Sequence, residues 1–153
     1  MSAPGRLELP ATPADPSRMG AHWARTLAAV PLFEGLSKRH LRRIASLGRT
    51  RRYGPGAAIV RAGDPGNAFY VILDGGARVV PAKGRARRLQ AGDCFGEMAL
   101  LDGAPRSADV VADGEVLTMW IGQQAFGKLL RSEPALAVAL LRTLAARLRD
   151  AQG

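Results

Sequence analysis

Between Arg49 and Ile121 the sequence alternates short β-prone runs with tight turn signals, and this punctuation constrains the fold more than any other feature. The turn signals are Gly54-Pro55-Gly56, Gly63-Asp64-Pro65-Gly66, Asp74-Gly75-Gly76, Lys83-Gly84, Ala91-Gly92-Asp93 and Asp113-Gly114. They separate predicted strands at residues 57–61, 69–73, 77–80, 94–95, 109–112 and 115–121. Strands this short, with turns at this spacing, are typical of an antiparallel β-roll or jelly roll. Such a fold closes on itself and so protects the edges of its sheet.

Helical patterns flank this β-rich region on both sides. We expect a first helix from about Ala21 to Val30, ended by Pro31, and a second helix N-capped by Ser37. Downstream, a short helix near 124–130 precedes a longer one, whose leucines recur with i, i+4 spacing: Leu136, Leu140, Leu144 and Leu148. The expected fold class is therefore mainly β with flanking helices, an antiparallel β-roll or jelly roll between N-terminal helices and a C-terminal helix.

The chain is predicted to consist of an arm and one domain. Residues 1–20 contain several prolines and no apolar period, so we expect a flexible, Pro-rich arm. The remainder, 21–153, has the usual length of a single domain. The arm lacks the continuous apolar region of a signal peptide. No apolar run reaches the ~20 residues that a membrane span needs, and we expect a cytoplasmic location.

The composition argues against several classes of site. Cys94 is the single cysteine, and His22 and His40 are the two histidines. A disulfide framework, a multi-cysteine zinc site and a histidine-based metal centre are therefore not expected. We expect no metal and no cofactor. We also expect no enzyme, because no nucleophile stands with a paired base and the β-rich region lacks the histidines of a cupin.

The excess of Lys and Arg over Asp and Glu raises the question of a nucleic-acid partner. The chain has 22 Lys+Arg against 13 Asp+Glu, a formal net charge of +9. An excess of this kind is one mark of proteins that bind nucleic acid. However, its densest clusters lie at 38–52 and 83–88, and no helix-turn-helix pattern follows the last helix. We expect no DNA-reading domain, and a weak, salt-sensitive contact with polyanions at most.

The stretch with the most chemical information runs from Phe95 to Ala108 and reads Phe-Gly-Glu-Met-Ala-Leu-Leu-Asp-Gly-Ala-Pro-Arg-Ser-Ala. Arg106 offers a planar fork of donors for two phosphate oxygens, and Ser107 adds a hydroxyl. Glu97 can accept from a sugar hydroxyl, and Gly96 lets the backbone approach a ligand closely. The backbone N–H groups of the turn at 98–100 can face the same anion. The stretch is therefore suited to a phosphorylated sugar.

These residues resemble the phosphate-binding cassette of the cyclic nucleotide-binding domain family, which has Phe-Gly-Glu, two residues, Leu, a variable loop and Pro-Arg-Ser/Thr-Ala. We call residues 95–108 the cassette. The resemblance extends from Val30 to Asp150 and includes the segments 31–36 and 68–73. The chain looks like a bacterial cyclic AMP receptor-type sensor, similar to the sensor domains of catabolite regulators, cyclic nucleotide-gated channels and protein kinase A regulatory subunits. The resemblance implies allosteric signal transduction, with a C-terminal lid helix that moves on ligand binding.

The resemblance also implies a role for each part of the site. Glu97 would bind the ribose 2′-hydroxyl, Arg106 the cyclic phosphate, and Ser107 would stand beside the phosphate and the purine. We expect cyclic AMP in preference to cyclic GMP, because Ser107 replaces the threonine that favours guanine and no other guanine-reading residue is visible. The expected ligand-binding residues are Gly96, Glu97, Met98, Ala99, Arg106 and Ser107. The candidate base contacts are Val80, Leu89 and Cys94, and the candidate lid residues are Leu144, Arg147 and Leu148.

Some questions stay open at this point. Several family members carry an acid that orients the phosphate-binding arginine, whereas this chain has Asn67 there and Asp64 three residues earlier.

One alternative function is a degenerate domain that binds a protein or an anion but no nucleotide. The output requires a protein partner or a fused effector, and the chain is either a stand-alone sensor or a fragment. The leucine stripe fits core or lid packing, with a dimer seam as the alternative, so the oligomeric state is open.

Overall fold

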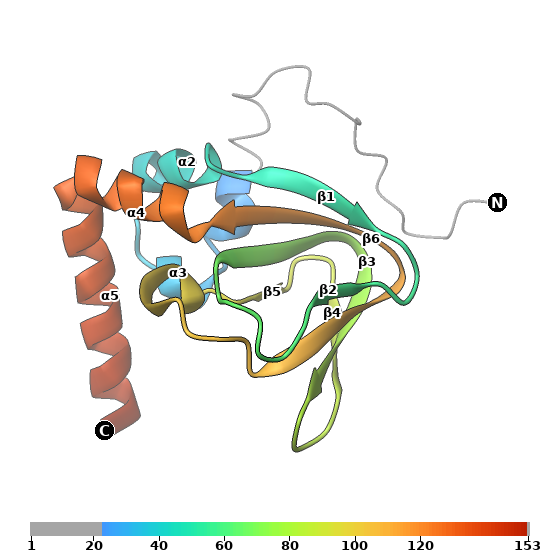
Figure 1. The fold of residues 1–153 in the computed structure, drawn as a ribbon. Helices are drawn as coiled ribbons and strands as arrows, with labels where there is room; N and C mark the ends of the chain where they lie inside the picture. Colours follow the sequence, from blue (N-terminus) through green and yellow to red (C-terminus); the bar gives the residue numbers. More distant parts are fainter. Residues whose placement is uncertain (1–22, 153) are drawn as a thin grey trace. The chain divides into compact units, whose positions relative to one another are not determined.

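The computed structural model describes residues 23–152, and the predicted arm at 1–20 lies outside them. The described chain divides into two compact units. Arg49–Gln123 form a β-rich unit, and the described parts of Thr12–Gly48 and Gln124–Gly153 form a helical unit. The mainly β fold with flanking helices that the sequence predicts is confirmed (Figure 1).

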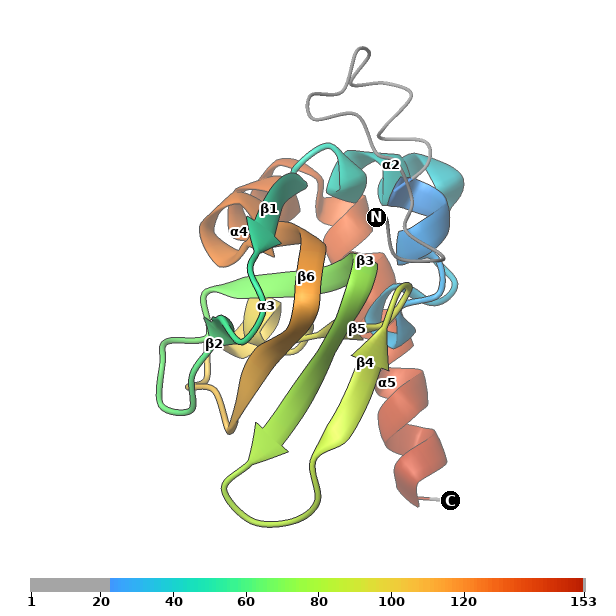
Figure 2. The same ribbon diagram turned by 90° about the vertical axis from the view of Figure 1, so that its right-hand side faces the viewer.

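The β-rich unit is one antiparallel sheet. Its elements are β1 (Arg49–Tyr53), β2 (Ala58–Val60), β3 (Ala68–Pro81), β4 (Arg87–Gln90), β5 (Cys94–Phe95), α3 (Ala99–Asp102) and β6 (Ala108–Gly122). The strand order is β1-β6-β3-β4, with β2 also paired to β6 and β5 to β3. The two long strands, β3 and β6, pair from Ala68↔Gly122 to Pro81↔Ala108 (Figure 2). They form the frame on which the shorter strands and the cassette are arranged.

Two of the predicted turns are irregularities inside long strands instead. Asp74-Gly75-Gly76 lies within β3 and Asp113-Gly114 within β6, and the β3–β6 register shifts on both sides of Asp74. Gly75 has φ +84°, and a Cβ there would lie 2.3 Å from the carbonyl oxygen of Glu115. Glycine therefore permits both the positive φ and the close approach of the two backbones. Register shifts of this kind bend and twist a strand without ending it, so the turn signals here do not separate strands.

The core of the β-rich unit lies on the inner face of the curved sheet. Side chains alternate along β3: Ala77 and Val79 are buried, whereas Arg78 and Val80 are exposed, as the period-2 geometry of a strand requires. The buried cluster comprises Tyr53, Ile59, Val60, Ile72, Ala77, Val79, Leu89, Phe95, Val110, Ala112 and Val116. This cluster forms the floor beneath the candidate site.

The helical unit contains a helical turn at 23–27, η1 (Pro31–Phe33), α2 (Lys38–Ala45), α4 (Gln123–Ser132) and α5 (Pro134–Gln152). Ser37 caps α2 as predicted, since its side chain accepts a hydrogen bond from the backbone N–H of His40 at 3.1 Å. The rings of Phe33 and Phe126 pack with centroids 6.1 Å apart. On α5, Leu141 and Leu148 are each 64% exposed. None of the described helices is both long and apolar enough to cross a membrane.

Candidate functional site

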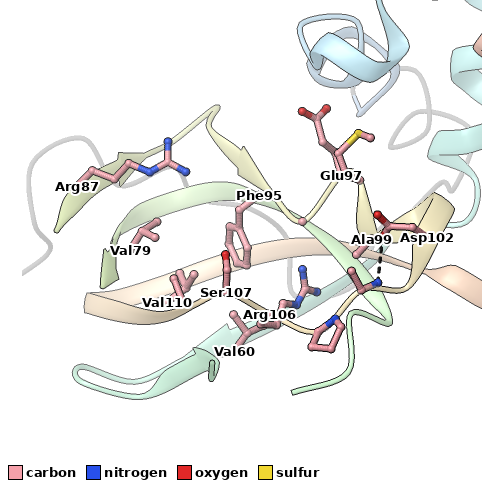
Figure 3. A pocket seen from close by; sticks show the side chains of 15 residues that line it. Val60, Val79, Arg87, Phe95, Glu97, Ala99, Asp102, Arg106, Ser107 and Val110 are labelled. Carbon is pink, nitrogen blue, oxygen red and sulfur yellow. Dashed lines mark hydrogen bonds between the residues drawn. The ribbon is translucent and has the colours of Figure 1, made fainter. Parts of the chain in front are cut away.

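A cavity of about 280 Å³ opens within the β-rich unit. Part of its wall is apolar: Val60, Val79, Phe95, Ala108 and Val110. The polar part comes from β4 and the cassette: Arg87, Glu97, Asp102, Arg106 and Ser107 (Figure 3). One apolar wall with a few charged groups suits a small molecule that carries an apolar ring and an anion. The volume lies just below the usual range of small-molecule sites, about 300–1,000 Å³.

The backbone at Arg106 is held by the turn that follows β2. The N–H of Arg106 donates to the carbonyl oxygen of Asp64 at 2.9 Å, and the N–H of Gly63 donates to the carbonyl oxygen of Arg106 at 2.8 Å. The preceding loop is fixed by Asp102, whose carboxylate accepts from the N–H of Ala104 at 2.9 Å. These local bonds direct the Arg106 side chain into the cavity wall.

The guanidinium of Arg106 is positioned by neutral groups. Its Nη2 donates to the carbonyl oxygen of Ala68, and its central carbon lies 5.8 Å from the centroid of the Tyr70 ring. Burial lowers the pKa of Arg106, while the nearby Tyr70 and Asp64 oppose that shift; an arginine side chain nevertheless stays cationic in proteins. Its Nε is buried with no hydrogen-bond partner among the described residues. A buried donor without a partner is costly. The Arg106 residue lines the cavity, so its positive charge favours an anion there.

Position 67 carries Asn instead of an acid, so other groups must orient the side chain of Arg106. Asn67 is exposed, and its carbonyl oxygen accepts from the N–H of Gln123 at 2.9 Å. The carboxylate of Asp64 accepts from the N–H of Arg61 at 3.1 Å, within its own turn. Arg106 is therefore oriented by the Ala68 carbonyl and the Tyr70 ring, with Asp64 contributing a nearby negative charge.

Gly96 provides the space that the guanidinium occupies. Its φ is +80°, and a Cβ at this position would lie 2.2 Å from Nη1 of Arg106 and 3.0 Å from the carbonyl oxygen of Ala68. Side chains rarely adopt such a φ, and no side chain fits beside the guanidinium. Gly96, which was predicted to let a ligand approach the backbone closely, therefore also leaves space for the guanidinium of Arg106.

The turn after Gly96 leads into the short helix α3. The N–H of Ala99 donates to the carbonyl oxygen of Gly96 at 3.1 Å, and that of Leu100 to the carbonyl oxygen of Glu97 at 3.2 Å. These two amides were expected to face an anion, but the turn itself supplies their acceptors. The carboxylate of Glu97 extends away from the guanidinium of Arg106 in Figure 3, although both residues line the cavity.

The structure brings all of the expected ligand-binding residues together around this cavity. Its lining includes Gly96, Glu97, Met98, Ala99, Arg106 and Ser107. Their roles toward a ligand stay predictions.

The three expected base contacts are not among the lining residues. Val80 is 39% exposed on the outer face of β3, and its neighbour Val79 faces the cavity instead. Leu89 is buried in the core cluster. Burial, reinforced by the charges of Glu97 and Asp93, raises the pKa of the Cys94 thiol to about 11. Cys94 is therefore mainly protonated at neutral pH, which suits a packing residue better than a reactive one.

The expected lid residues lie on α5, in the helical unit. Leu144 is half-buried, whereas Arg147 is exposed and Leu148 is 64% exposed. Their lid role stays a prediction.

Several lining residues were missed from the sequence: Val60, Val79, Arg87, Asp102, Ala104, Pro105 and Val110. Counting alternation inward from the buried Ala77 would have found Val79. Predicting Arg87 as a lining residue would have required the pairing register of β4, which the basic hairpin sequence does not reveal.

Within residues 23–152, no three His, Cys, Asp or Glu side chains gather closely enough to hold a metal ion. The groups that line the cavity are an arginine pair, carboxylates, a hydroxyl and an apolar wall.

Comparison with known proteins points to one family. A sequence model described as the cyclic nucleotide-binding domain matches residues 50–133, more than half of the chain. The cAMP-dependent protein kinase regulatory subunit of Colletotrichum orbiculare is 40% identical over 106 residues, which cover 68% of this chain and 27% of that protein. The chain thus spans about a quarter of the length of this curated relative.

Two solved structures share the fold. The N-terminal domain of a transcriptional regulator from Streptomyces coelicolor superposes with a TM-score of 0.73 at 29% identity, covering 82% of this chain and 94% of that one. The regulatory domain of Toxoplasma gondii PKA, a co-crystal structure with cAMP, gives a TM-score of 0.67 at 26% identity, covering 87% of this chain and 51% of that one.

Proposed function

Because the chain belongs to the cyclic nucleotide-binding domain family, we propose that it is a regulatory sensor that binds a purine cyclic nucleotide in the cavity beside Arg106. The observation that carries the proposal is that the cationic Arg106 and the hydroxyl of Ser107 line one cavity together with an apolar wall. A cyclic nucleotide supplies both an anion for the cation and an apolar ring for the wall.

The parts of the ligand are matched to parts of the cavity. The cyclic phosphate pairs with Arg106 and Ser107, because a guanidinium fork binds two phosphate oxygens. The ribose lies against Gly96 and the turn after it, where Glu97 accepts from a ribose hydroxyl. The purine extends along the apolar wall that includes Val60 and Val79.

Cyclic AMP is the first ligand to test. The Colletotrichum relative is named a cAMP-dependent kinase subunit, and the Toxoplasma domain was crystallised with cAMP. Ser107 stands near the end of the cassette, beside the proposed phosphate position. A serine there excludes neither adenine nor guanine.

Isothermal titration of the chain with cyclic AMP and cyclic GMP tests this function. We expect saturable binding, and we expect Glu97→Gln to weaken it by about tenfold, because the amide replaces a charged acceptor whose hydrogen bond is worth about 1.5–3 kcal/mol. Glu34→Gln makes the same chemical change at an exposed position of the helical unit and should leave the affinity unchanged. Absence of heat with both nucleotides would overturn the proposal.

Bound nucleotide, in the same proposal, favours one of two arrangements of α5. Leu141 and Leu148 are supporting observations, since they offer exposed apolar surface that a second arrangement could bury. The ligand can shift this equilibrium only by its differential affinity for the two states. Output then passes to a protein partner or to a fused effector.

Hydrogen–deuterium exchange checks this coupling. Saturating cyclic AMP should slow exchange of amides in 134–152 by at least several-fold, while α2 serves as the internal reference because it carries none of the expected ligand or lid residues. Protection confined to the cassette, with exchange in α5 unchanged, would refute the coupling and leave nucleotide binding intact.

A further inference from the structure

The strand β1 forms one edge of the antiparallel sheet in the β-rich unit. It pairs with β6 on the side away from β3, and no other described strand pairs with it (Figure 2). Alternate residues of an edge strand direct their N–H and C=O groups away from the sheet. Among the described residues, the backbone of β1 has no backbone partner other than β6. The outer edge of β1 therefore offers both donors and acceptors to a further strand.

The side chains of β1 are accessible on both faces of the strand. Four consecutive residues are exposed: Arg49, Thr50, Arg51 and Arg52. A strand with one buried face would alternate between buried and exposed side chains instead. Opposite the middle of β1, Met119 and Thr118 of β6 are fully buried. The change from a buried strand to an exposed one therefore occurs between two neighbouring strands, and β1 meets solvent along its whole edge.

Three arginines make this edge positively charged on both faces. Arg49 and Arg51 project to one face and Arg52 to the other, because successive strand residues alternate. No ion pair within the described part of the chain includes any of the three. The guanidinium carbon of Arg51 lies 4.9 Å from the centroid of the Tyr53 ring. None of these arginines lines the cavity beside Arg106, so their charge is available to a different ligand.

A hollow of about 270 Å³ lies beside the C-terminal end of β1. Its lining residues are Arg52, Tyr53, Gly54, Glu115 and Val116. Tyr53 and Val116 stand opposite each other in the pairing of β1 with β6, and both are buried. Their apolar surface favours an apolar side chain here, and the carboxylate of Glu115 disfavours an acidic one. A strand added along β1 would thus place acidic side chains beside the arginines and an apolar side chain at the hollow.

We propose that β1 is a docking edge, to which an extended acidic segment of a partner protein adds as an antiparallel strand. Antiparallel addition continues the pairing of the sheet, in which every described pair of strands is antiparallel. Opposite charges across such a pair stabilise it, whereas like charges destabilise it. A second copy of β1 would bring its own arginines to the edge, so the charge favours an acidic partner over self-association.

The backbone of the edge strand favours a peptide over a nucleic acid. A peptide supplies both N–H donors and C=O acceptors to the outward groups of β1, whereas phosphate groups supply acceptors only and would leave the C=O groups of β1 unpaired. The proposed docking is independent of nucleotide binding in the cavity. Charged side chains on an edge strand can also serve only to prevent aggregation, and this protective role requires no partner.

The test is an NMR titration of the full chain, without nucleotide, with a capped peptide whose core is Val-Glu-Glu-Thr-Glu. In antiparallel alignment this core places Val opposite Tyr53 and one glutamate opposite each arginine of β1. We expect saturable shifts of the β1 amide signals and slower hydrogen exchange of its outward N–H groups. A Val-Gln-Gln-Thr-Gln peptide, which lacks the charges, should bind about tenfold more weakly.

Two N-methylated forms of the acidic peptide separate strand addition from general charge attraction. Methyl groups on alternate residues remove the N–H donors along one edge of the peptide and leave its charge unchanged. Only one edge of an added strand pairs with β1, so one form should lose binding and the complementary form should retain it. The same affinity for both forms would overturn the proposal, because charge attraction does not depend on the N–H groups.

A double variant tests the arginines themselves. Arg49→Gln with Arg52→Gln should weaken binding of the acidic peptide by about fivefold. The matched control is Arg61→Gln with Arg85→Gln, which removes two exposed charges elsewhere in the β-rich unit and should leave the peptide affinity nearly unchanged. Equal losses in the two double variants would show attraction by net charge and contradict docking at β1. Thermal melting confirms that both variants are folded.

Two further outcomes would assign the edge differently. Absence of binding of the acidic peptide to the unmodified chain would leave the arginines of β1 with the protective role alone. A single-stranded oligonucleotide that shifts the β1 amide signals, while the acidic peptide does not, would assign the edge to a nucleic acid. Either result would overturn the proposed docking of a peptide strand.

Discussion

Replacing Arg106 by methionine is expected to weaken cyclic AMP binding by about thirtyfold or more. Removing one partner of a buried, hydrogen-bonded charge pair costs about 2–5 kcal/mol, and about 1.4 kcal/mol is a factor of ten. The free energy of unfolding without ligand should change little. The lost hydrogen bond to the Ala68 carbonyl is offset by removal of a buried cation whose Nε has no partner. Titration calorimetry and chemical denaturation measure the two effects separately.

Two further variants separate pairing from general attraction. Arg61→Met removes the same charge from an exposed residue that is not part of the cavity wall, and it should leave the affinity nearly unchanged. Arg106→Lys keeps a cation but loses the planar fork, so its affinity should fall between those of the unmodified chain and Arg106→Met. Equal losses of cyclic AMP affinity in Arg61→Met and Arg106→Met would show that the affinity depends on the net charge of the protein and not on pairing with Arg106.

The second large effect is expected at Gly96, although this residue carries no functional group. In Gly96→Ala the new Cβ would lie 2.2 Å from Nη1 of Arg106, so the guanidinium must move away from its present position. Loss of one charge-assisted hydrogen bond, about 1.5–3 kcal/mol, corresponds to weaker cyclic AMP binding by about tenfold to a hundredfold. The positive φ adds a stability cost of about 1–2 kcal/mol. Titration and denaturation of the same preparation report both quantities.

Gly92→Ala is the matched control for Gly96→Ala. Gly92 also has a positive φ, +96°, but a Cβ there would meet no atom within 4 Å. It should therefore show a similar loss of stability with cyclic AMP affinity retained. If Gly92→Ala weakened binding as much as Gly96→Ala, backbone strain rather than displacement of Arg106 would be the cause.

The cassette was predictable because its residues are consecutive. A glycine, an acid, a short turn and an arginine with a hydroxyl lie within one segment, so their spacing alone brings them to one site. The N-cap at Ser37 was predictable for the same reason, since its partner is the backbone of His40, three residues away. Local chemistry of this kind does not depend on the rest of the fold.

The apolar wall of the cavity was harder to predict because it depends on strand register. A shift of one residue moves a side chain to the other face of a sheet, which is why Val79 lines the cavity while Val80 is exposed on the other face. The turn predicted at Asp74-Gly75-Gly76 was also wrong, because these residues lie within β3. The same residue types serve a turn and an irregularity inside a strand, and only the partner strand distinguishes them.

By itself, the sequence determined the mainly β class, the flanking helices and the cassette, because these depend on periodicity and on neighbours along the chain. The tertiary structure alone decided how Arg106 is oriented, because the Ala68 carbonyl and the Tyr70 ring come from a strand distant in sequence. It also decided that Arg87 faces the cavity while Arg88 does not. Pairing between strands assigns each side chain to a face, and that pairing is settled only when the whole sheet has formed.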